Sequence, residues 1–196
     1  MANIDAPTGL TPVRYRDGAP YNGAHNRYYI ASGEAYNLFI GDPVALSGTG
    51  DAFGVPGIVR ATAGGGSSAG DGMLGVVVGF ENLTSDNLSR SYRPSGTAGY
   101  VLVADSPNLV FEIQEDSDTA TLAVTDIGLN ANFIIGTGNT ATGTSAVELD
   151  SNTAAVTATL DLRILGLVPR PNNEIGTNAK WYVATNNHPW LSLEGE

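Results

Sequence analysis

Leu74-Gly75-Val76-Val77-Val78-Gly79-Phe80 is the longest apolar run in the chain, and the β-branched residue valine dominates it. The run is too short to cross a membrane as a helix, and β-branched side chains lose rotamer freedom in a helix. Gly-rich sequence precedes it at 63–72, and a polar loop follows it at 81–91. These features predict a buried strand between two loops, with further strands packed to either side.

The composition extends this prediction to the whole chain. The 196 residues include 25 Gly and 10 Pro, which suits many short strands joined by tight turns. We expect a mainly β protein with a single β-barrel or β-sandwich domain over residues 27–196. An extended N-terminal arm over residues 1–26 and at most one short helix complete the expected fold. Only 15% of the residues are charged, which indicates that sister subunits or a partner cover much of the surface.

The charge and the residue types exclude several classes of function. The net charge is −11 with no basic stripe, so we expect no nucleic-acid partner. No segment approaches 18 apolar residues, and the first residues do not form a signal peptide, so we expect no membrane association and synthesis in a host cytoplasm. The chain has no Cys and therefore no disulfide or thiolate metal site. Eight of its nine cations are Arg, which is typical of interfaces but also follows from genome composition.

Local patterns place the remaining elements. Residues 99–104 and 109–113 flank Asp105-Ser106-Pro107-Asn108, which predicts a β-hairpin. Residues 117–127 form the one predicted helix, with Ser117 or Asp118 as its cap. The polar stretch 136–155 is the candidate for a projecting loop. Alternation of apolar and charged residues predicts a strand with one buried face over 158–168, and 181–184 is the last predicted strand.

No catalytic motif is present, so we expect no enzymatic activity and no cofactor. His25 and His188 lie at opposite ends of the chain without the local spacing of a metal site. Acidic residues cluster at Glu112, Glu115, Asp116 and Asp118. Because their spacing does not match a calcium-binding helix-loop-helix, we interpret them as an exposed acidic loop with a helix cap, and we expect no metal.

Several segments together resemble the capsid decoration (cement) proteins of tailed bacteriophages. These segments are Ala6-Pro7-Thr8-Gly9-Leu10-Thr11-Pro12-Val13, Gly18-Ala19-Pro20-Tyr21-Asn22-Gly23, Tyr28-Tyr29-Ile30, Gly41-Asp42-Pro43-Val44, Gly75-Val76-Val77-Val78-Gly79, Asp105-Ser106-Pro107, Phe111-Glu112-Ile113-Gln114 and Arg163-Ile164-Leu165-Gly166-Leu167. The resemblance implies a β-rich structural protein on the outer surface of the virion. Such a protein clamps neighbouring major capsid protein subunits against internal DNA pressure, often as a homotrimer. It implies no catalytic residues.

A clamping protein acts through interfaces, which use aromatic and Arg anchors rather than a deep pocket. The termini carry such residues among their Pro and Gly residues. We therefore expect contacts from Arg14, Tyr15, Arg16, Tyr21, Tyr28 and Trp190. The first 30 residues carry three Arg and two Asp on an otherwise acidic chain, so the arm could dock on a neighbouring copy.

Two other classes of function stay open at this point. The first is another virion or surface β module, such as a tail or fibre protein or a glycan-binding adhesin. Exposed aromatic side chains or a fibrous repeat would favour it, and the chain has no clear repeat. The second is an enzyme, for which the sequence offers no nucleophile motif.

Overall fold

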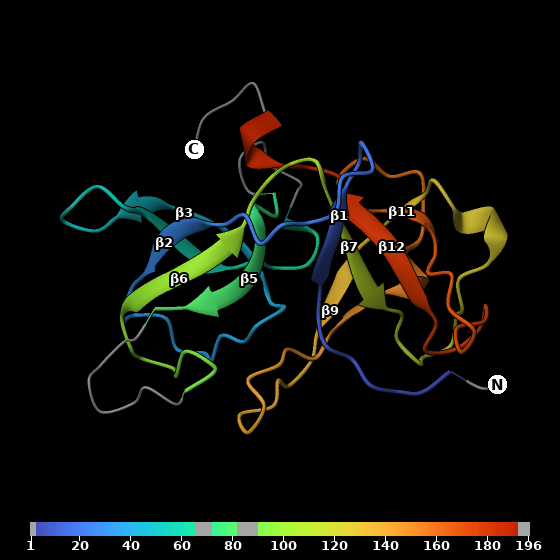
Figure 1. The fold of residues 1–196 in the computed structure, drawn as a ribbon, viewed down its shortest axis with the longest axis horizontal. Coiled ribbons are helices and arrows are strands. Elements are labelled where there is room, and N and C mark those ends of the chain that lie inside the picture. Colours follow the sequence, from blue (N-terminus) through green and yellow to red (C-terminus); the bar gives the residue numbers. More distant parts are fainter. Residues whose placement is uncertain (1–2, 66–71, 82–89, 192–196) are drawn as a thin grey trace.

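The computed structural model describes residues 3–65, 72–81 and 90–191, and the predicted mainly β fold is confirmed (Figure 1). Helical structure in these ranges is limited to 3-10 turns, among them η2 (Val124–Asp126), η3 (Ser151–Thr153) and η4 (Pro189–Leu191). The strands are β1 (Thr11–Tyr15), β2 (Asn26–Ile30), β3 (Pro43–Gly50), β4 (Pro56–Arg60), β5 (Gly75–Phe80), β6 (Gly99–Ala104), β7 (Leu109–Gln114), β8 (Asn130–Ala131), β9 (Phe133–Ile135), β10 (Val147–Leu149), β11 (Leu162–Leu167) and β12 (Lys180–Thr185).

Five strands form a closed barrel in the order β2-β4-β3-β5-β6. The barrel closes where Tyr29 of β2 pairs in parallel with Gly57 of β4. The predicted central strand is β5, which lies between β3 and β6. Side chains from all five strands and from two neighbouring loop residues fill the interior: Tyr28, Ile30, Leu38, Val44, Ile58, Leu74, Val77, Val101 and Val103.

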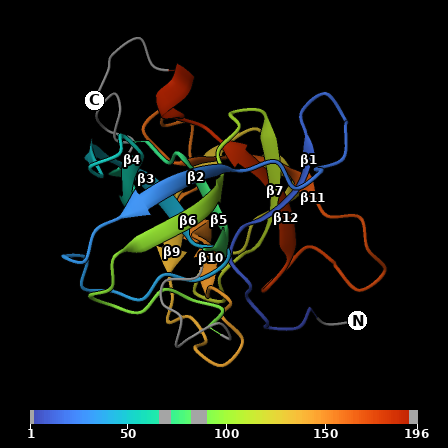
Figure 2. The same ribbon diagram turned by 60° about the vertical axis from the view of Figure 1, so that its left-hand side comes forward.

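The second half of the architecture is a five-stranded sheet in the order β1-β7-β12-β11-β8. Figures 1 and 2 both place this sheet on one side of the molecule and the barrel on the other. The predicted alternation in β11 is confirmed, since Leu162 and Ile164 are buried and Arg163 is exposed. The strand starts later than predicted because residues 158–161 form a turn and a bend, and the buried Asp161 Oδ2 accepts a hydrogen bond from the Gly64 amide at 2.7 Å.

One apolar core joins the barrel to the sheet. Val76 and Ala104 of the barrel strands belong to the same buried cluster as Phe111 and Trp181 of the sheet. The β9–β10 hairpin adds Phe133, Val147 and Leu149 to this cluster. The two halves therefore share their apolar interior.

The hairpin predicted over residues 99–113 is wrong. β6 pairs with β2 and β5 inside the barrel, whereas β7 pairs with β1 and β12 in the sheet. Asp105-Ser106-Pro107-Asn108 is the crossover between the two halves. All six residues of β7 are buried, so this strand needs neighbours on both edges and cover on both faces, which a hairpin with β6 would not supply.

The helix predicted over residues 117–127 is also wrong, because only η2 forms there. Carboxylate side chains accept hydrogen bonds from backbone amides that would bond to backbone carbonyls in a helix. Asp118 accepts from the Ala120 amide at 3.2 Å, and Glu115 accepts from the Leu122 amide at 3.3 Å. Leu122 is 1% exposed, so its burial in the core also holds the segment in an irregular path.

The N-terminal segment is extended, as predicted, but its middle belongs to the sheet of its own chain. β1 pairs with β7, and Leu10 just before it is 1% exposed. The outer edge of β1 is covered by a bridge between Arg14 and Pro20. The opposite edge strand, β8, is covered in the same way by a bridge between Asn130 and Ala155.

The stretch 136–155 is not one projecting loop. Residues 139–142 are exposed, but β10 lies within the stretch and buries Val147 and Leu149. The Gly-rich stretch 63–72 before the central strand lies partly outside the described residues, as does most of the polar loop 81–91 that follows this strand.

Candidate functional site

The structure brings most of the predicted contact residues to the junction between the barrel and the sheet. Asp105, at the end of β6, is 8% exposed and lies at the centre of this junction. Its carboxylate accepts a 2.5 Å hydrogen bond from the Tyr28 hydroxyl and 3.0 Å bonds from Asn26 Nδ2. Burial and this carboxylate raise the pKa of Tyr28 well above its usual value.

Tyr28 does not present a contact surface. The side chain is 3% exposed and points into the barrel interior, where it belongs to the buried cluster. β2 alternates its side chains between the two faces of the barrel wall, and Tyr28 falls on the inner face. Its role in the structure is to hold Asp105.

The C-terminal turn η4 lies over this junction, at the top of the molecule in Figure 1. His188 is 4% exposed, and its Nδ1 accepts from the Trp190 amide at 3.2 Å. Burial lowers the pKa of His188, and Asp105 opposes that shift. Trp190 is 53% exposed, and Leu191 beside it is 63% exposed. The turn η4 is therefore anchored by the buried His188 and exposes the apolar side chains of Trp190 and Leu191.

The N-terminal hairpin joins the same junction from the other side. Arg16 is exposed, and its Nη2 donates to the Thr185 carbonyl at 2.9 Å. The Tyr15 and Tyr21 rings lie 6.4 Å apart, and the Tyr21 hydroxyl donates to the Ala24 carbonyl at 2.9 Å. Desolvation is the main reason that the pKa of Tyr21 is raised, with Tyr15 and Asp105 adding to it.

Arg14 is separate from this group. Its guanidinium carbon lies 5.4 Å from the centre of the Tyr182 ring, on strand β12. Three further arginines lie over tyrosine rings within the chain: Arg27 at 3.5 Å from Tyr100, and Arg60 and Arg93 at 4.5 and 6.0 Å from Tyr36. Part of the arginine content is therefore used inside the molecule.

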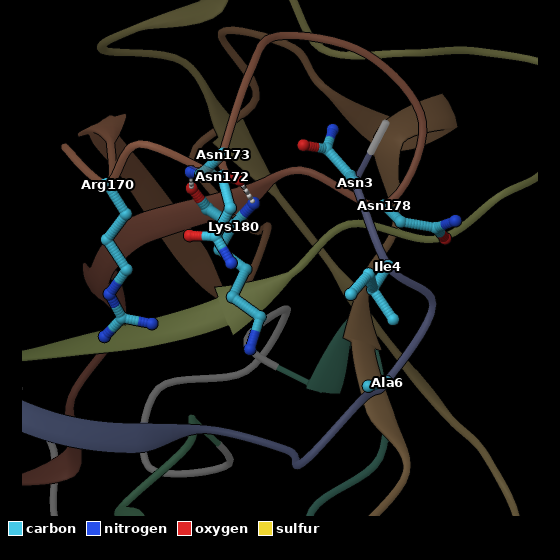
Figure 3. Close-up of a pocket in the computed structure, with 8 residues that line it drawn as sticks. All are labelled: Asn3, Ile4, Ala6, Arg170, Asn172, Asn173, Asn178 and Lys180. Atoms are coloured by element: carbon cyan, nitrogen blue, oxygen red, sulfur yellow. Dashed lines mark hydrogen bonds between the residues drawn. The ribbon is translucent and has the colours of Figure 1, made fainter. Parts of the chain in front are cut away.

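A shallow pocket of 210 Å³ lies between the N-terminal segment and the loop before β12 (Figure 3). Its lining is rich in amides: Asn3, Ile4, Ala6, Arg170, Asn172, Asn173, Asn178 and Lys180. Most of these polar groups are already bound within the chain.

Two examples show how the pocket's polar groups are used. Asn173 donates to the Val168 and Lys180 carbonyls at 2.9 and 2.8 Å. Arg170 forms a two-pronged pair with Glu112 at 2.8 and 2.7 Å. Sequence reasoning did not single out this pocket, and its only signal is the density of Asn over 172–178.

The structure separates the acidic residues that the sequence places together. Glu112 pairs with Arg170, and Glu115 is buried, where its Oε2 accepts from Trp181 Nε1 at 2.7 Å. Asp116 and Asp118 instead meet Asp150, which lies more than thirty residues further along the chain. Neither His belongs to a cluster of potential metal ligands in the described part of the chain: His25 is exposed, and His188 is buried in the junction.

Comparison with known proteins adds no family to these observations. No family model matches the chain, and neither the curated proteins nor the solved structures contain a match. Within residues 3–65, 72–81 and 90–191, no helix has the length and apolar character needed to cross a membrane.

Proposed function

We propose that the protein is a structural component of a tailed-phage virion that decorates the outer surface of the capsid. In this role it clamps neighbouring major capsid protein subunits, and it acts as a homotrimer. The sequence segments that resemble decoration proteins suggest this role. The proposed contact region is the Trp190 surface, which comprises Arg16, Trp190 and Leu191.

The observation that carries the proposal is the exposed side chain of Trp190 on a turn that the buried His188 anchors. Tryptophan and arginine are the residues most enriched among those that dominate binding energy. Trp190 keeps 53% of its surface exposed, although the buried His188 below it holds the backbone of the turn. Side chains that are ordered before binding lose less entropy when the complex forms.

The remaining surface is consistent with binding over an area rather than in a cleft. The pocket beneath the N-terminal segment is shallow, and the Asn173 amide in its lining donates to two carbonyls of the chain. The edges of the sheet are covered by segments of the same chain, so addition of a strand from a neighbour is not part of the proposal.

Co-sedimentation with capsid shells assembled from the major capsid protein of the same phage tests the proposal. We expect the protein to bind in saturable amounts and the variant Trp190→Ala to bind at least tenfold more weakly. The matched control is Phe53→Ala, because Phe53 is 88% exposed at the distant β3–β4 turn. Absence of binding overturns the function, whereas equal binding by the wild type and Trp190→Ala overturns the proposed surface.

Deletion of residues 1–22 is not a clean test of this surface. The deletion removes β1 and the buried Leu10, so it also exposes part of the apolar core. Point substitutions at exposed side chains avoid that difficulty. Light scattering after size exclusion tests the homotrimer separately. A protein that is monomeric in solution and also forms no trimers on capsid shells would contradict the proposed homotrimer.

The alternative is a different virion or surface module that binds glycans. The amide-lined pocket favours it, because amide groups bind sugar hydroxyls well. The pocket has no aromatic side chain in its lining to stack on a sugar ring. Glycan-array binding that is lost in Asn172→Ala but kept in Trp190→Ala would favour this alternative.

A further inference from the structure

Two short acidic segments meet at the ends of neighbouring strands. Asp116-Ser117-Asp118 follows β7, and Asp150-Ser151-Asn152 follows β10. Glu115 and Leu149 pair in parallel, and the Asp116 amide donates to the Leu149 carbonyl at 3.0 Å. Because the two segments run in the same direction, both bring their Asp residues to the same edge.

The three carboxylates converge closely. One carboxylate oxygen of each of Asp116, Asp118 and Asp150 lies within 4.8 Å of the other two. Asp116 is buried, Asp150 is half-buried and Asp118 is exposed. Three carboxylates at this spacing repel one another unless a positive charge lies between them.

The buried carboxylate of Asp116 gives an independent indication of a ligand. Its Oδ1 accepts from the Ser151 amide at 3.2 Å and from the Ser151 hydroxyl at 2.7 Å. Its Oδ2 is buried and has no hydrogen-bond partner, although the residue is only 5% exposed. A buried carboxylate oxygen without a partner is costly, and a bound cation removes that cost.

Among the described residues, no ion pair joins a cation of the chain to these three Asp residues. The ion pairs within the described ranges join Arg27 to Glu81, and Arg170 and Lys180 to Glu112. None of these three cations pairs with the three Asp residues. A cation from solution would balance the charge of the three carboxylates.

We propose that Asp116, Asp118 and Asp150 bind a divalent cation of the calcium class. All three donors are hard oxygens, and neither His nor Cys accompanies them, which disfavours zinc. Calcium accepts six to eight oxygen ligands in flexible geometry, which suits irregular segments that also carry backbone carbonyls and water. The Ala120 carbonyl is close by, since it accepts from the Ser151 hydroxyl at 2.9 Å.

The cation would fasten the irregular segment after β7 to the end of β10. That segment replaces the helix expected over 117–127, so few backbone hydrogen bonds hold it otherwise. The inference is independent of the proposed function, because it concerns the stability of a single chain. Sequence spacing alone argues against a metal, because it does not connect Asp150 with the acidic group near Asp116.

Calorimetric titration of the full chain tests the site after removal of metals with EDTA. We expect CaCl2 to bind with a stoichiometry of one per chain and MgCl2 to bind at least tenfold more weakly. At calcium a hundredfold above its Kd, the unfolding temperature should rise by about 5 °C or more. The titration extends from a 10-fold molar excess of CaCl2 to about 10 mM. If it shows neither binding heat nor a rise in the unfolding temperature over this range, the calcium site is overturned.

Substitutions then assign the site to its residues. Asp116→Asn should lower the calcium affinity at least tenfold, and Asp118→Asn, at an exposed position, provides a second variant that keeps the fold. The control is Asp17→Asn, which removes one negative charge from the exposed N-terminal hairpin. Equal loss of affinity in Asp17→Asn and Asp118→Asn, or equal affinity for magnesium and calcium, overturns the proposal.

Discussion

The Tyr28 hydroxyl lies 2.5 Å from Asp105 Oδ2 and links the wall of the barrel to the crossover that leads into the sheet. Both residues are buried, at 3% and 8% exposure. A hydrogen bond to a charged, buried acceptor is among the stronger ones in proteins. This bond therefore fixes the place where the chain passes from the barrel to the sheet.

Removal of that hydroxyl should destabilise the protein. In Tyr28→Phe the Asp105 carboxylate keeps only its bonds from Asn26, and we expect a loss of about 1–3 kcal/mol in the free energy of unfolding. Urea unfolding measures the loss. The control is Tyr29→Phe on the same strand, where the half-buried side chain should tolerate the change within about 0.5 kcal/mol. Equal stability of the two variants would contradict the assignment.

Arg93 should be the least replaceable arginine of the chain. It is 0% exposed, and its guanidinium donates to the Thr97, Glu34, Tyr36 and Ala31 carbonyls at 2.6, 3.1, 3.0 and 2.8 Å. Lysine cannot reproduce this fork of donors. We expect Arg93→Lys to lower the free energy of unfolding by about 2–4 kcal/mol.

The control for this prediction is Arg163→Lys. Arg163 is exposed on β11, so its replacement should change the unfolding free energy by less than about 1 kcal/mol. Thermal unfolding of both variants provides the comparison. A stable Arg93→Lys variant would show that the surrounding carbonyls find other donors, such as water.

Stability should fall in mild acid because of His188. Burial keeps the pKa of His188 below its usual value, so the unfolded chain binds this proton at a higher pH than the folded chain. The stability that neutral, buried His188 contributes is therefore fully present above the pKa of the unfolded chain, about 6.5. This stability is lost as the pH falls below that value. The variant His188→Asn should lose less stability than the wild type between pH 7 and pH 5.

Unfolding temperatures at pH 7, 6 and 5 measure this difference. His25→Asn is the matched control, because His25 is exposed and its Nδ1 contacts only the nearby Gly23 carbonyl. It should follow the wild-type curve. If His188→Asn also follows the wild-type curve, the acid sensitivity has another source.

Two glycines in β5 should respond differently to alanine. A Cβ at Gly75 would lie 2.3 Å from the Ala104 carbonyl oxygen, whereas a Cβ at Gly79 would lie 3.4 Å from the Leu102 side chain. We expect Gly75→Ala to prevent folding or to cost more than about 3 kcal/mol, and Gly79→Ala to be tolerated. Circular dichroism and thermal unfolding separate the two outcomes, and a folded, stable Gly75→Ala variant would refute the close approach.

The strands of this protein were readable from local pattern, but their partners were not. Val76, Val77 and Leu162 lie in strands where apolar runs or alternation predicted them. The pairing of β6 and β7 was predicted wrongly because a turn between two apolar runs has the same pattern in a hairpin and in a crossover. Only burial on both faces of β7 decides between them.

The contact residues were partly predictable for a similar reason. The N-terminal hairpin and the turn η4 both reach the junction, where Arg16 donates to the Thr185 carbonyl and the Trp190 amide donates to the buried His188. Tyr28 could not be assigned from sequence, because an aromatic residue in a strand has equal chances of facing the core or the solvent until the register is known.

The sequence by itself determined that this protein is β-rich, acidic and free of cysteine, because these properties depend on composition and on spacing over a few residues. The tertiary structure alone decided that a barrel and a sheet share one core, and that Asp150 meets Asp116 and Asp118. Those relationships join residues far apart in the chain. They depend on which buried surfaces and backbone edges satisfy one another, and no local pattern of residues contains that information.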